Sequence, residues 1–251
     1  MVDRRLFLAG AAGVAIAPAL AEEKTALQVI ELRQYTLKGG TRAAFTRLFE
    51  REFVVPQNAV GAHVLGVFRD LDDPDRFVWM RGFTSMEARK TALEAFYFGP
   101  VWKAHRDRAN GMMIDSDNVL LLRPLMGGDL LDPERLGGHG VVRIAIHRLR
   151  ATDPAAFAAF FNDVMAPRIE KAGGHVLATL TTETAANSFP RLPVREHDPV
   201  LAWIARFRDE AAERALSTKL AATGAWRDGI ADALLPALMQ KPEVLRLTPV
   251  A

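Results

Sequence analysis

The stretch VIELRQYTLK at residues 29–38 returns in outline as VVRIAIHRLR at residues 141–150. In both stretches apolar and polar side chains alternate, which is the period of a β-strand with one buried face. Apolar residues at helical spacing follow each strand, over residues 45–53 and again over residues 157–165. An internal repeat of this kind decides the fold, because each half has the same faces to bury.

Further strand patterns recur in the same order in both halves. A second strand is predicted at HVLGVF and HVLATL, a third at FVWMRGF and VLAWIARF, and a fourth at VLLLRP and VLRLTP. With the helical patterns between them, each half has the order β-α-β-β-α-β of a ferredoxin-like unit. Helices cover only one face of such a sheet, so the bare faces of two units are expected to pack together. We therefore predict an α+β protein in which two tandem ferredoxin-like repeats form an intrachain dimeric α/β barrel.

The repeat also sets the predicted domain boundaries. The first unit covers residues 27–125, the second and more divergent unit covers residues 141–250, and a glycine-rich linker at residues 126–140 joins them. Residues 181–198 make a longer connection than their counterpart in the first unit, and we interpret them as a surface loop insertion. Since the barrel closes within one chain, the sequence leaves a further homo-oligomer open.

The N-terminus has the features of an export signal. Residues 4–8 read R-R-x-F-L, a weakly apolar segment follows, and Ala19–Ala21 has the A-x-A pattern of a cleavage site. The segment resembles a twin-arginine signal, with Asp3 in place of the usual Ser or Thr. We expect residues 1–21 to be a signal peptide and the mature protein to be periplasmic or secreted. No second long apolar run follows, so we expect no membrane contact after cleavage.

The composition describes a globular chain and excludes several chemistries. Among 251 residues, 49% are hydrophobic and 25% are charged, the formal net charge is +2, and cysteine is absent. A sizeable core is therefore available, whereas disulfides, thiolate metal sites and a catalytic thiol are excluded. No run of Lys and Arg stands out, so nucleic acid is not an expected partner.

Three stretches carry a resemblance to a known family: VIELRQYTLKGGTRAAFTRLFEREFVVPQ, FRDLDDPDRFVWMRGF and YFGPVWKAHRDRANGMMIDSDNVLLLRP. They resemble the NIPSNAP family of dimeric α/β-barrel proteins, and the second half resembles it in pattern. The resemblance implies a ferredoxin-like α+β barrel and leaves the activity open. The wider superfamily includes cofactor-independent oxygenases, haem-degrading enzymes and isomerases, chemistries that fold alone does not transfer.

One histidine is the candidate catalytic residue. The run HRDRAN suggests a kinase catalytic loop, but its spacing is wrong, and the pattern instead predicts a helix that begins at Pro100. His105 lies on the apolar stripe of that helix, near Trp102, as either a buried structural histidine or a group aimed into a pocket. If Trp226 is aligned with Trp102, Gly229 takes the place of His105, so the first half has a histidine that the second lacks.

Charged and aromatic side chains on two predicted strands are the candidate ligand-binding residues. Glu31, Arg33 and Tyr35 share one face of the first strand, and Trp79 and Arg81 join them from the third. The face is either exposed, or a seam of ion pairs, or buried where the bare sheets meet; buried charges then need partners or a ligand. The predicted ligand-binding residues are Arg33, Tyr35, His63, Trp79, Arg81, Tyr97 and Trp102.

No metal or cofactor is predicted. His63 and His175 occupy equivalent places at the start of the second strands, but no H-x-H or H-E-x-x-H spacing accompanies them. The leading hypothesis is a module that binds a small apolar or oxygen-rich ligand or acts in interactions. The alternatives are a cofactor-independent oxygenase or isomerase with a pocket around His105, and non-covalent haem binding with His105 as the axial ligand.

Overall fold

The computed structural model describes residues 26–127, 131–150, 154–196, 198–222 and 239–250. In its first half the elements are β1 (Val29–Leu37), α1 (Arg42–Glu52), α2 (Val54–Ala59), β2 (His63–Asp70), β3 (Arg76–Phe83), α3 (Met86–Tyr97), α4 (Pro100–Asn110) and β4 (Met113–Met126). A short helix, α5 (Pro133–Leu136), follows in the linker. The second half contains β5 (Val141–Arg148), α6 (Pro154–Phe160), the π-helical turn η2 (Phe161–Met165), α7 (Ala166–Lys171), β6 (Gly174–Thr182), β7 (Val200–Phe207), α8 (Glu210–Ala222) and β8 (Glu243–Pro249).

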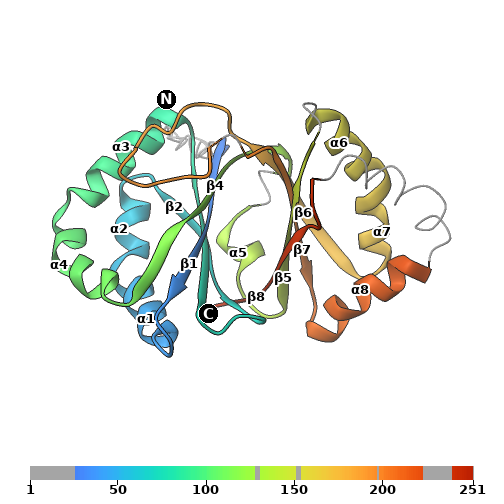
Figure 1. Ribbon diagram of the computed structural model, residues 1–251, viewed down its shortest axis with the longest axis horizontal. Coiled ribbons are helices and arrows are strands. Elements are labelled where there is room, and N and C mark those ends of the chain that lie inside the picture. Colours follow the sequence, from blue (N-terminus) through green and yellow to red (C-terminus); the bar gives the residue numbers. More distant parts are fainter. Residues whose placement is uncertain (1–25, 128–130, 151–153, 197, 223–238, 251) are drawn as a thin grey trace, which may run out of the picture.

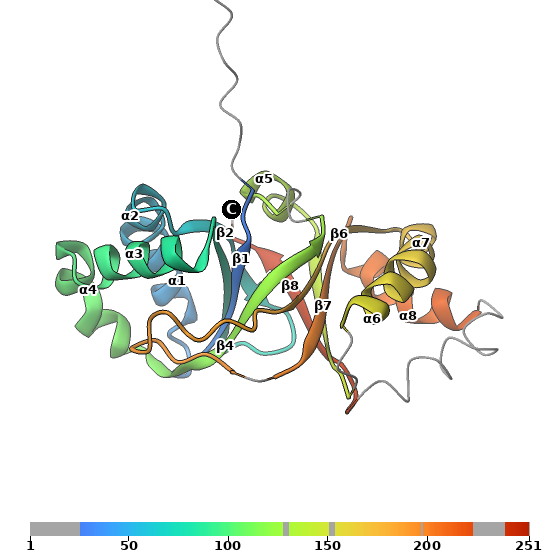
Figure 2. The ribbon, with the colours of Figure 1, turned by 90° about the horizontal axis from the view of Figure 1, so that it is seen from above.

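The strands close into one antiparallel barrel in the order β1-β3-β2-β8-β5-β7-β6-β4. The halves join where β2 pairs with β8, at Arg69 and Thr248, and where β4 pairs with β6, at Arg123 and Thr181. Helices α1–α4 flank one side of the barrel and α6–α8 the opposite side (Figures 1 and 2). The prediction of a mixed α/β fold with a barrel closed within one chain is therefore confirmed.

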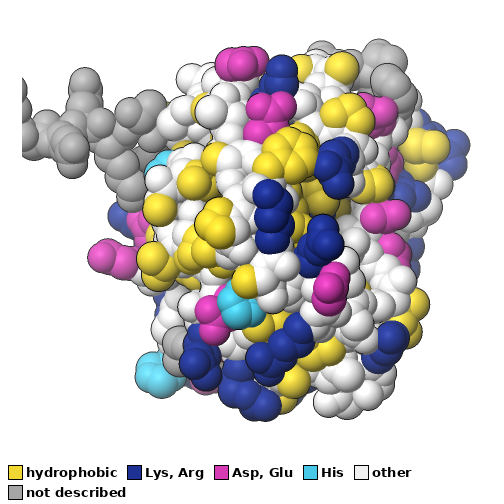
Figure 3. All heavy atoms as spheres, turned by 90° about the vertical axis from the view of Figure 1, so that its left-hand side faces the viewer, with side chains coloured by type: hydrophobic (Ala, Val, Ile, Leu, Met, Phe, Trp, Pro, Cys, Tyr) yellow, Lys and Arg dark blue, Asp and Glu magenta, His cyan; other side chains and the backbone are white. Residues whose placement is uncertain are grey.

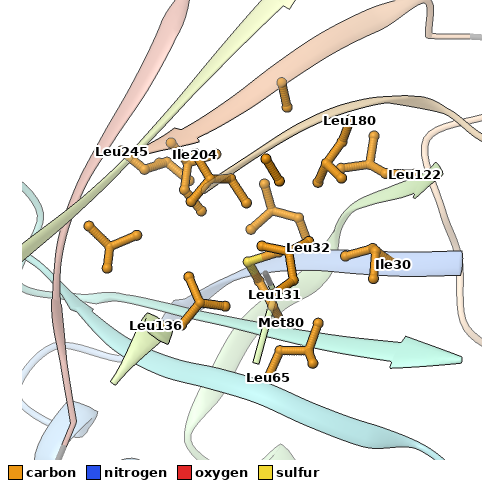
Figure 4. Packing of buried hydrophobic residues seen from close by; sticks show 14 of the residues in the cluster. Ile30, Leu32, Leu65, Met80, Leu122, Leu131, Leu136, Leu180, Ile204 and Leu245 are labelled. Atoms are coloured by element: carbon orange, nitrogen blue, oxygen red, sulfur yellow. The ribbon is translucent and has the colours of Figure 1, made fainter. Parts of the chain in front are cut away.

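The barrel interior is packed with apolar side chains. One alternating set from each strand points inward, with Ile30 and Leu32 from β1 and Met80 from β3 (Figure 4). Leu131 and Leu136 from the predicted linker join the same cluster, so the linker belongs to the core. The described part of the interior is therefore filled by side chains, and ligand sites have to be sought elsewhere.

The other alternating set lies on the outside of the barrel and is covered by helices. Glu31, Arg33 and Tyr35 on β1 are all buried there. The sequence interpretation placed this polar face either in solvent, at a seam or where the bare sheets meet. That placement is wrong, because the uncharged set with Ile30 and Leu32 takes the interior, and α1–α4 cover the charged set instead.

Helix starts follow their capping residues. Ser85 caps α3 by accepting a hydrogen bond from Ala88 N at 3.0 Å. Asp209 does the same for α8, since its Oδ1 accepts from Ala212 N at 2.7 Å. The helix predicted from Pro100 is also confirmed as α4.

The loop between β6 and β7 crosses from the second half to the first. In Figures 1 and 2 this orange segment, residues 183–196, lies beside α3, and we call it the crossing loop. Ser188 Oγ donates to Met86 O at 3.1 Å, and the ring of Phe189 stacks on Tyr97 with 5.9 Å between centroids. Phe189 is buried. The predicted surface insertion is therefore packed onto the first half.

Candidate functional site

Three arginines surround one glutamate beneath the helices of the first half. Glu31 and Arg33 come from β1, Arg81 from β3 and Arg89 from α3, and all four side chains are at most 1% exposed. Arg33 Nη1 lies 2.8 Å from Glu31 Oε2, and Arg81 Nε donates to the same oxygen at 2.8 Å. Arg89 Nε donates to Oε1 at 2.6 Å. We call these four residues the arginine cluster.

The cluster holds more positive than negative charge. Three guanidiniums meet one carboxylate, and the described residues provide no second acidic partner for them, so two positive charges are unmatched. Burial opposes ionisation of Glu31, but the guanidiniums of Arg81, Arg33 and Arg89 outweigh it and hold the pKa of this carboxyl well below its usual range. Burial lowers the pKa of Arg89, against the attraction of Glu31. Unmatched buried charge is costly and therefore needs an explanation.

Two of the arginines are hydrogen-bonded to polar residues that face a cavity. Arg33 Nε donates to Tyr35 OH at 2.9 Å, and Arg81 Nη1 donates to Gln57 Oε1 at 2.7 Å. Arg81 Nη2 also lies 2.7 Å from Glu31 Oε2, but in a direction unsuited to a hydrogen bond. Tyr35 and Gln57 both line the cavity, so they connect the cluster to it.

The third arginine is held by the crossing loop. Arg89 Nη1 donates to Asn187 Oδ1 and to Ser188 Oγ, each at 3.0 Å. Leu192 of the same loop lines the cavity. A segment of the second half therefore completes the site in the first.

The cavity itself is small and aromatic. It has a volume of about 100 Å³ and lies between the outer face of β1 and β3 and the helices α1, α2, α3 and α4. Its walls include Tyr35, Phe45, Phe49, Phe53, Trp79, Phe96, Tyr97 and Trp102. Figure 3 views the molecule from this helical side, where hydrophobic and basic side chains are interspersed. We call this space the first cavity.

The buried polar groups of its wall offer hydrogen-bond donors. Tyr35 accepts from Arg33, so its own hydroxyl proton remains available to a ligand. Gln57 uses Oε1 on Arg81, which leaves its amide N–H groups. Trp79 Nε1 is buried without a partner in the structure. Hydrogen-bond donors that are themselves bonded to guanidinium groups are suited to bind a negatively charged oxygen.

The structure brings most predicted ligand-binding residues together. Arg33 and Arg81 lie in the arginine cluster, and Tyr35, Trp79, Tyr97 and Trp102 line the first cavity. Arg81 lies over the ring of Trp79, with Cζ 5.0 Å from its centroid. These residues therefore form one continuous site from two strands and two helices.

Two predicted site residues, His63 and His105, lie apart from this site. His63 is exposed at the start of β2, and His175 is exposed beside Glu170. His105 is 30% exposed, with Nε2 3.4 Å from Glu52 Oε2, and it is not among the cavity-lining residues. Its catalytic assignment stays a prediction. The compared residues Trp226 and Gly229 lie outside the described part of the chain.

Sequence reasoning missed Arg89, Gln57 and the contacts of the crossing loop. Arg89 is in line with Leu93 and Phe96 on the buried face of α3, so an arginine within an apolar helical stripe was the available signal. No comparable signal marks Asn187, since its contact with Arg89 joins residues 98 positions apart.

The second half contains the same ion pair with its charges exchanged. The register of β5 on β7 matches that of β1 on β3 and places Arg143 where Glu31 stands. Four residues after the helix cap, α3 has Arg89 and α8 has Glu213. Arg143 Nη1 bonds to Glu213 Oε1, as Arg89 bonds to Glu31. One strand-to-helix ion pair is therefore common to both halves.

The two additional arginines have no counterpart in the second half. Ala145 stands where Arg33 does, because each lies opposite a tryptophan on the neighbouring strand. By the same register, Ala205 stands where Arg81 does. The barrel is therefore built in its second half without these two charges, which makes them additions particular to the first.

The described residues contain no group of three or more histidine and acidic side chains arranged as metal ligands would be. They also contain no helix with the length and hydropathy of a membrane span. The features that remain to be explained are the unmatched charge and the aromatic cavity.

Comparison with solved structures extends over the whole barrel. The chain is similar to a "putative monooxygenase" of Fusobacterium nucleatum, with a TM-score of 0.58 and 9% identity over 90% of this chain and 94% of that one. For a protein of Lactobacillus acidophilus with the same description, the TM-score is 0.56 and the identity is 11%, over 89% of this chain and 94% of that one. For an anthrone oxidase-like protein, the TM-score is 0.56 and the identity is 12%, over 89% of this chain and 92% of that one. At these identities the likeness concerns the fold alone.

Comparison of the sequence gives the family of the first half. None of the curated proteins matches the chain. The family model described as NIPSNAP matches residues 30–126, which run from β1 to the end of β4 and include the whole arginine cluster. The chain therefore carries a NIPSNAP domain, which forms the first half of its barrel.

Proposed function

We propose that the first half of the protein binds a small aromatic organic anion in the first cavity. The observation that carries this proposal is the pair of unmatched positive charges behind a wall of hydrogen-bond donors. An anion in the cavity would offset that charge through Tyr35 and Gln57, each of which is already bonded to an arginine. The second half, which lacks those arginines, supports the view that the fold does not need them.

The size of the cavity favours a ligand with one ring. An engineered apolar cavity of about 150 Å³ holds benzene, and the first cavity is of that order, at about 100 Å³. The rings of Tyr97 and Trp102 meet edge to face at 4.9 Å, as do those of Phe49 and Trp79 at 4.6 Å. Such walls favour a planar ring over an aliphatic chain.

A second candidate function is catalysis by a cofactor-independent oxygenase. The whole-chain structural neighbours include proteins described as monooxygenases and as anthrone oxidase-like, which favours this candidate. Donors backed by arginines would also stabilise a phenolate or enolate, the electron-rich form that such chemistry requires. Among the described lining residues, however, no His, Asp or Glu is present as a base, for this reaction or for an isomerase. Binding is therefore better supported than turnover. Haem is less favoured still, because the cavity is too small for a porphyrin.

We also infer how the chain is organised and where it acts. The shared strand order and the common ion pair support two tandem ferredoxin-like repeats. The R-R-x-F-L and A-x-A patterns support export by the twin-arginine route to the periplasm or beyond, although residues 1–21 lie outside the described part. Export with the mature chain folded would deliver a formed pocket to that compartment.

Calorimetric titration with benzoate and benzamide tests the proposed function, because the two probes share a ring and differ in charge. We expect benzoate to bind at least tenfold more tightly than benzamide, a difference of about 1.4 kcal/mol. Tyr35→Phe keeps the ring and removes the donor, and it should weaken benzoate binding about tenfold or more, since hydrogen bonds to charged groups contribute about 1.5–3 kcal/mol. His175→Ala, at an exposed position of the second half, is the control and should leave benzoate binding unchanged. Equal affinities for the two probes, or no benzoate binding at millimolar concentration, would refute the proposal.

A further inference from the structure

A second cavity lies in the other half of the barrel. It has a volume of about 290 Å³ and lies on the outer face of β5 and β7, on the side covered by α6 and α8. Its walls include Phe157, Phe161, Met165, Trp203, Leu216 and Leu220. By strand register Trp203 corresponds to Trp79, so the second cavity occupies the place in its half that the first cavity occupies in the other.

A partly buried histidine offers an unused donor to this cavity. His147 stands where Tyr35 stands in the first half and lines the second cavity. Trp203 Nε1 donates to His147 Nε2 at 3.0 Å, so in the neutral ring the proton is on Nδ1. Nδ1 is buried and has no partner in the structure. Burial, with a contribution from Arg143, lowers the pKa of His147 to about 4, which keeps the ring neutral near pH 7.

The charges around His147 are balanced, in contrast to the arginine cluster. Arg143 is paired with Glu213, which also accepts from Arg246 Nε at 2.6 Å, and Arg246 Nη1 bonds to Asp72 at 2.7 Å. Two guanidiniums thus meet two carboxylates. Lys241 also lines the cavity, but it is exposed and therefore solvated. Among the residues that the structure describes, a buried anion would find no excess of positive charge here.

Arg143 adds a second unused donor. Its Nε is buried without a partner, while its Nη1 is bonded to Glu213. A buried donor without an acceptor is costly, and a ligand oxygen would satisfy it. The second cavity therefore combines a large apolar volume with N–H donors, and its described residues leave no buried charge unmatched.

We propose that the second cavity binds an uncharged, largely apolar carbonyl compound about two rings in size, whose oxygen accepts a hydrogen bond from His147 Nδ1–H. The two halves would then select different ligands, an anion in the first and a ketone or similar acceptor in the second. This site does not depend on the first, because its described lining residues belong to the second half.

The fluorescent naphthyl ketone 6-propionyl-2-dimethylaminonaphthalene is a suitable probe, since its emission reports both an apolar environment and a hydrogen bond to its carbonyl. We expect saturable binding with a blue shift, and at least tenfold weaker binding to His147→Phe, which keeps a ring and removes the donor. His147→Gln, which retains an N–H donor, should recover part of the affinity. Benzoate should not displace the probe, which separates this test from that of the first cavity.

Nuclear magnetic resonance of ¹⁵N-histidine-labelled wild-type protein provides a readout independent of any variant. The His147 Nδ1 signal should shift on addition of the ketone, whereas the signals of exposed His63 and His175 should not. The proposal is overturned if the ketone binds wild type and His147→Phe equally, or if the Nδ1 signal is unchanged at saturation. It is also overturned if 2-naphthoate, an anion with the same ring system, binds as tightly as the ketone.

Discussion

Replacement of Glu31 by Gln removes the only carboxylate of the arginine cluster while keeping its shape. Three guanidiniums, those of Arg33, Arg81 and Arg89, would then face one another with no acidic partner. Breaking a buried ion pair by removal of one partner costs about 3–5 kcal/mol, because the other charge stays buried and uncompensated. Domains of this kind are stable by about 5–15 kcal/mol. We therefore expect Glu31→Gln to remove about a fifth or more of the free energy of unfolding.

A matched variant separates charge from packing. Arg33→Met removes one of the excess charges and keeps a long apolar stem over the rings of Tyr35 and Trp79. Glu31 keeps its bonds to the other two arginines, and a buried charge replaced by a hydrophobic side chain of similar volume is often neutral or stabilising. Arg33→Met should therefore be more stable than Glu31→Gln by at least about 2 kcal/mol.

Urea unfolding followed by circular dichroism measures both effects. With a slope of about 1–3 kcal/mol per molar urea, a loss of about 3–5 kcal/mol lowers the midpoint for Glu31→Gln by roughly 1–5 M at an unchanged slope. Benzoate should restore more stability to Glu31→Gln than to the wild type, because the cluster then has three unmatched charges instead of two. A midpoint for Glu31→Gln within 0.2 M of wild type (roughly 0.5 kcal/mol), or a larger loss for Arg33→Met, would refute the idea that excess positive charge is buried here.

The remaining predictions concern pH, backbone and loop. The pKa of His147 is lowered from 6.5 to about 4, so its contribution to stability is complete above pH 6.5 and is lost as the pH falls toward 4, by at most about 3 kcal/mol; His147→Phe should flatten this part of the stability profile. Gly140→Ala should destabilise by about 2 kcal/mol or more, because φ is 106° and a Cβ would lie 2.3 Å from a backbone oxygen, whereas Gly40→Ala, at φ 75° with open space, should cost about half as much in thermal melts. Alanine at both Asn187 and Ser188 should speed hydrogen exchange in α3 and leave α8 unchanged; equal acceleration in both helices would contradict a local role for the crossing loop.

The barrel could be predicted from the sequence because its signals are local and repeated. Alternation within 29–38 and 141–150 gives strands, and a sheet with helices on one face has another face to bury. Which set of side chains faces inward was harder to predict, since both alternating sets contain large apolar residues. The set with Ile30 and Leu32 is free of charge, and that was the better guide to the interior.

The site could be predicted only where neighbouring strands supply it. Arg33 and Trp79 face each other across a strand pair whose register follows from the pattern. Arg89 is 58 residues from Glu31 and the crossing loop is farther still, so their contacts depend on how helix and loop pack in three dimensions. The sequence pattern drew attention to His105 because it lies near Trp102 on α4. In the structure His105 does not line the first cavity, and its ion-pair partner is Glu52.

The exchange of charge between the halves separates what the fold needs from what it does not. An ion pair between the first strand and the second long helix is present in both halves, as Glu31 with Arg89 and as Arg143 with Glu213. The acidic residue lies on the strand in one half and on the helix in the other. The pair therefore stabilises the fold through the attraction between its charges, whichever element holds the positive one. Structural need thus accounts for one arginine of the first cluster, and the proposed anion would account for the other two. The filled barrel interior separates the two cavities, so an anion in the first should leave ketone affinity in the second unchanged.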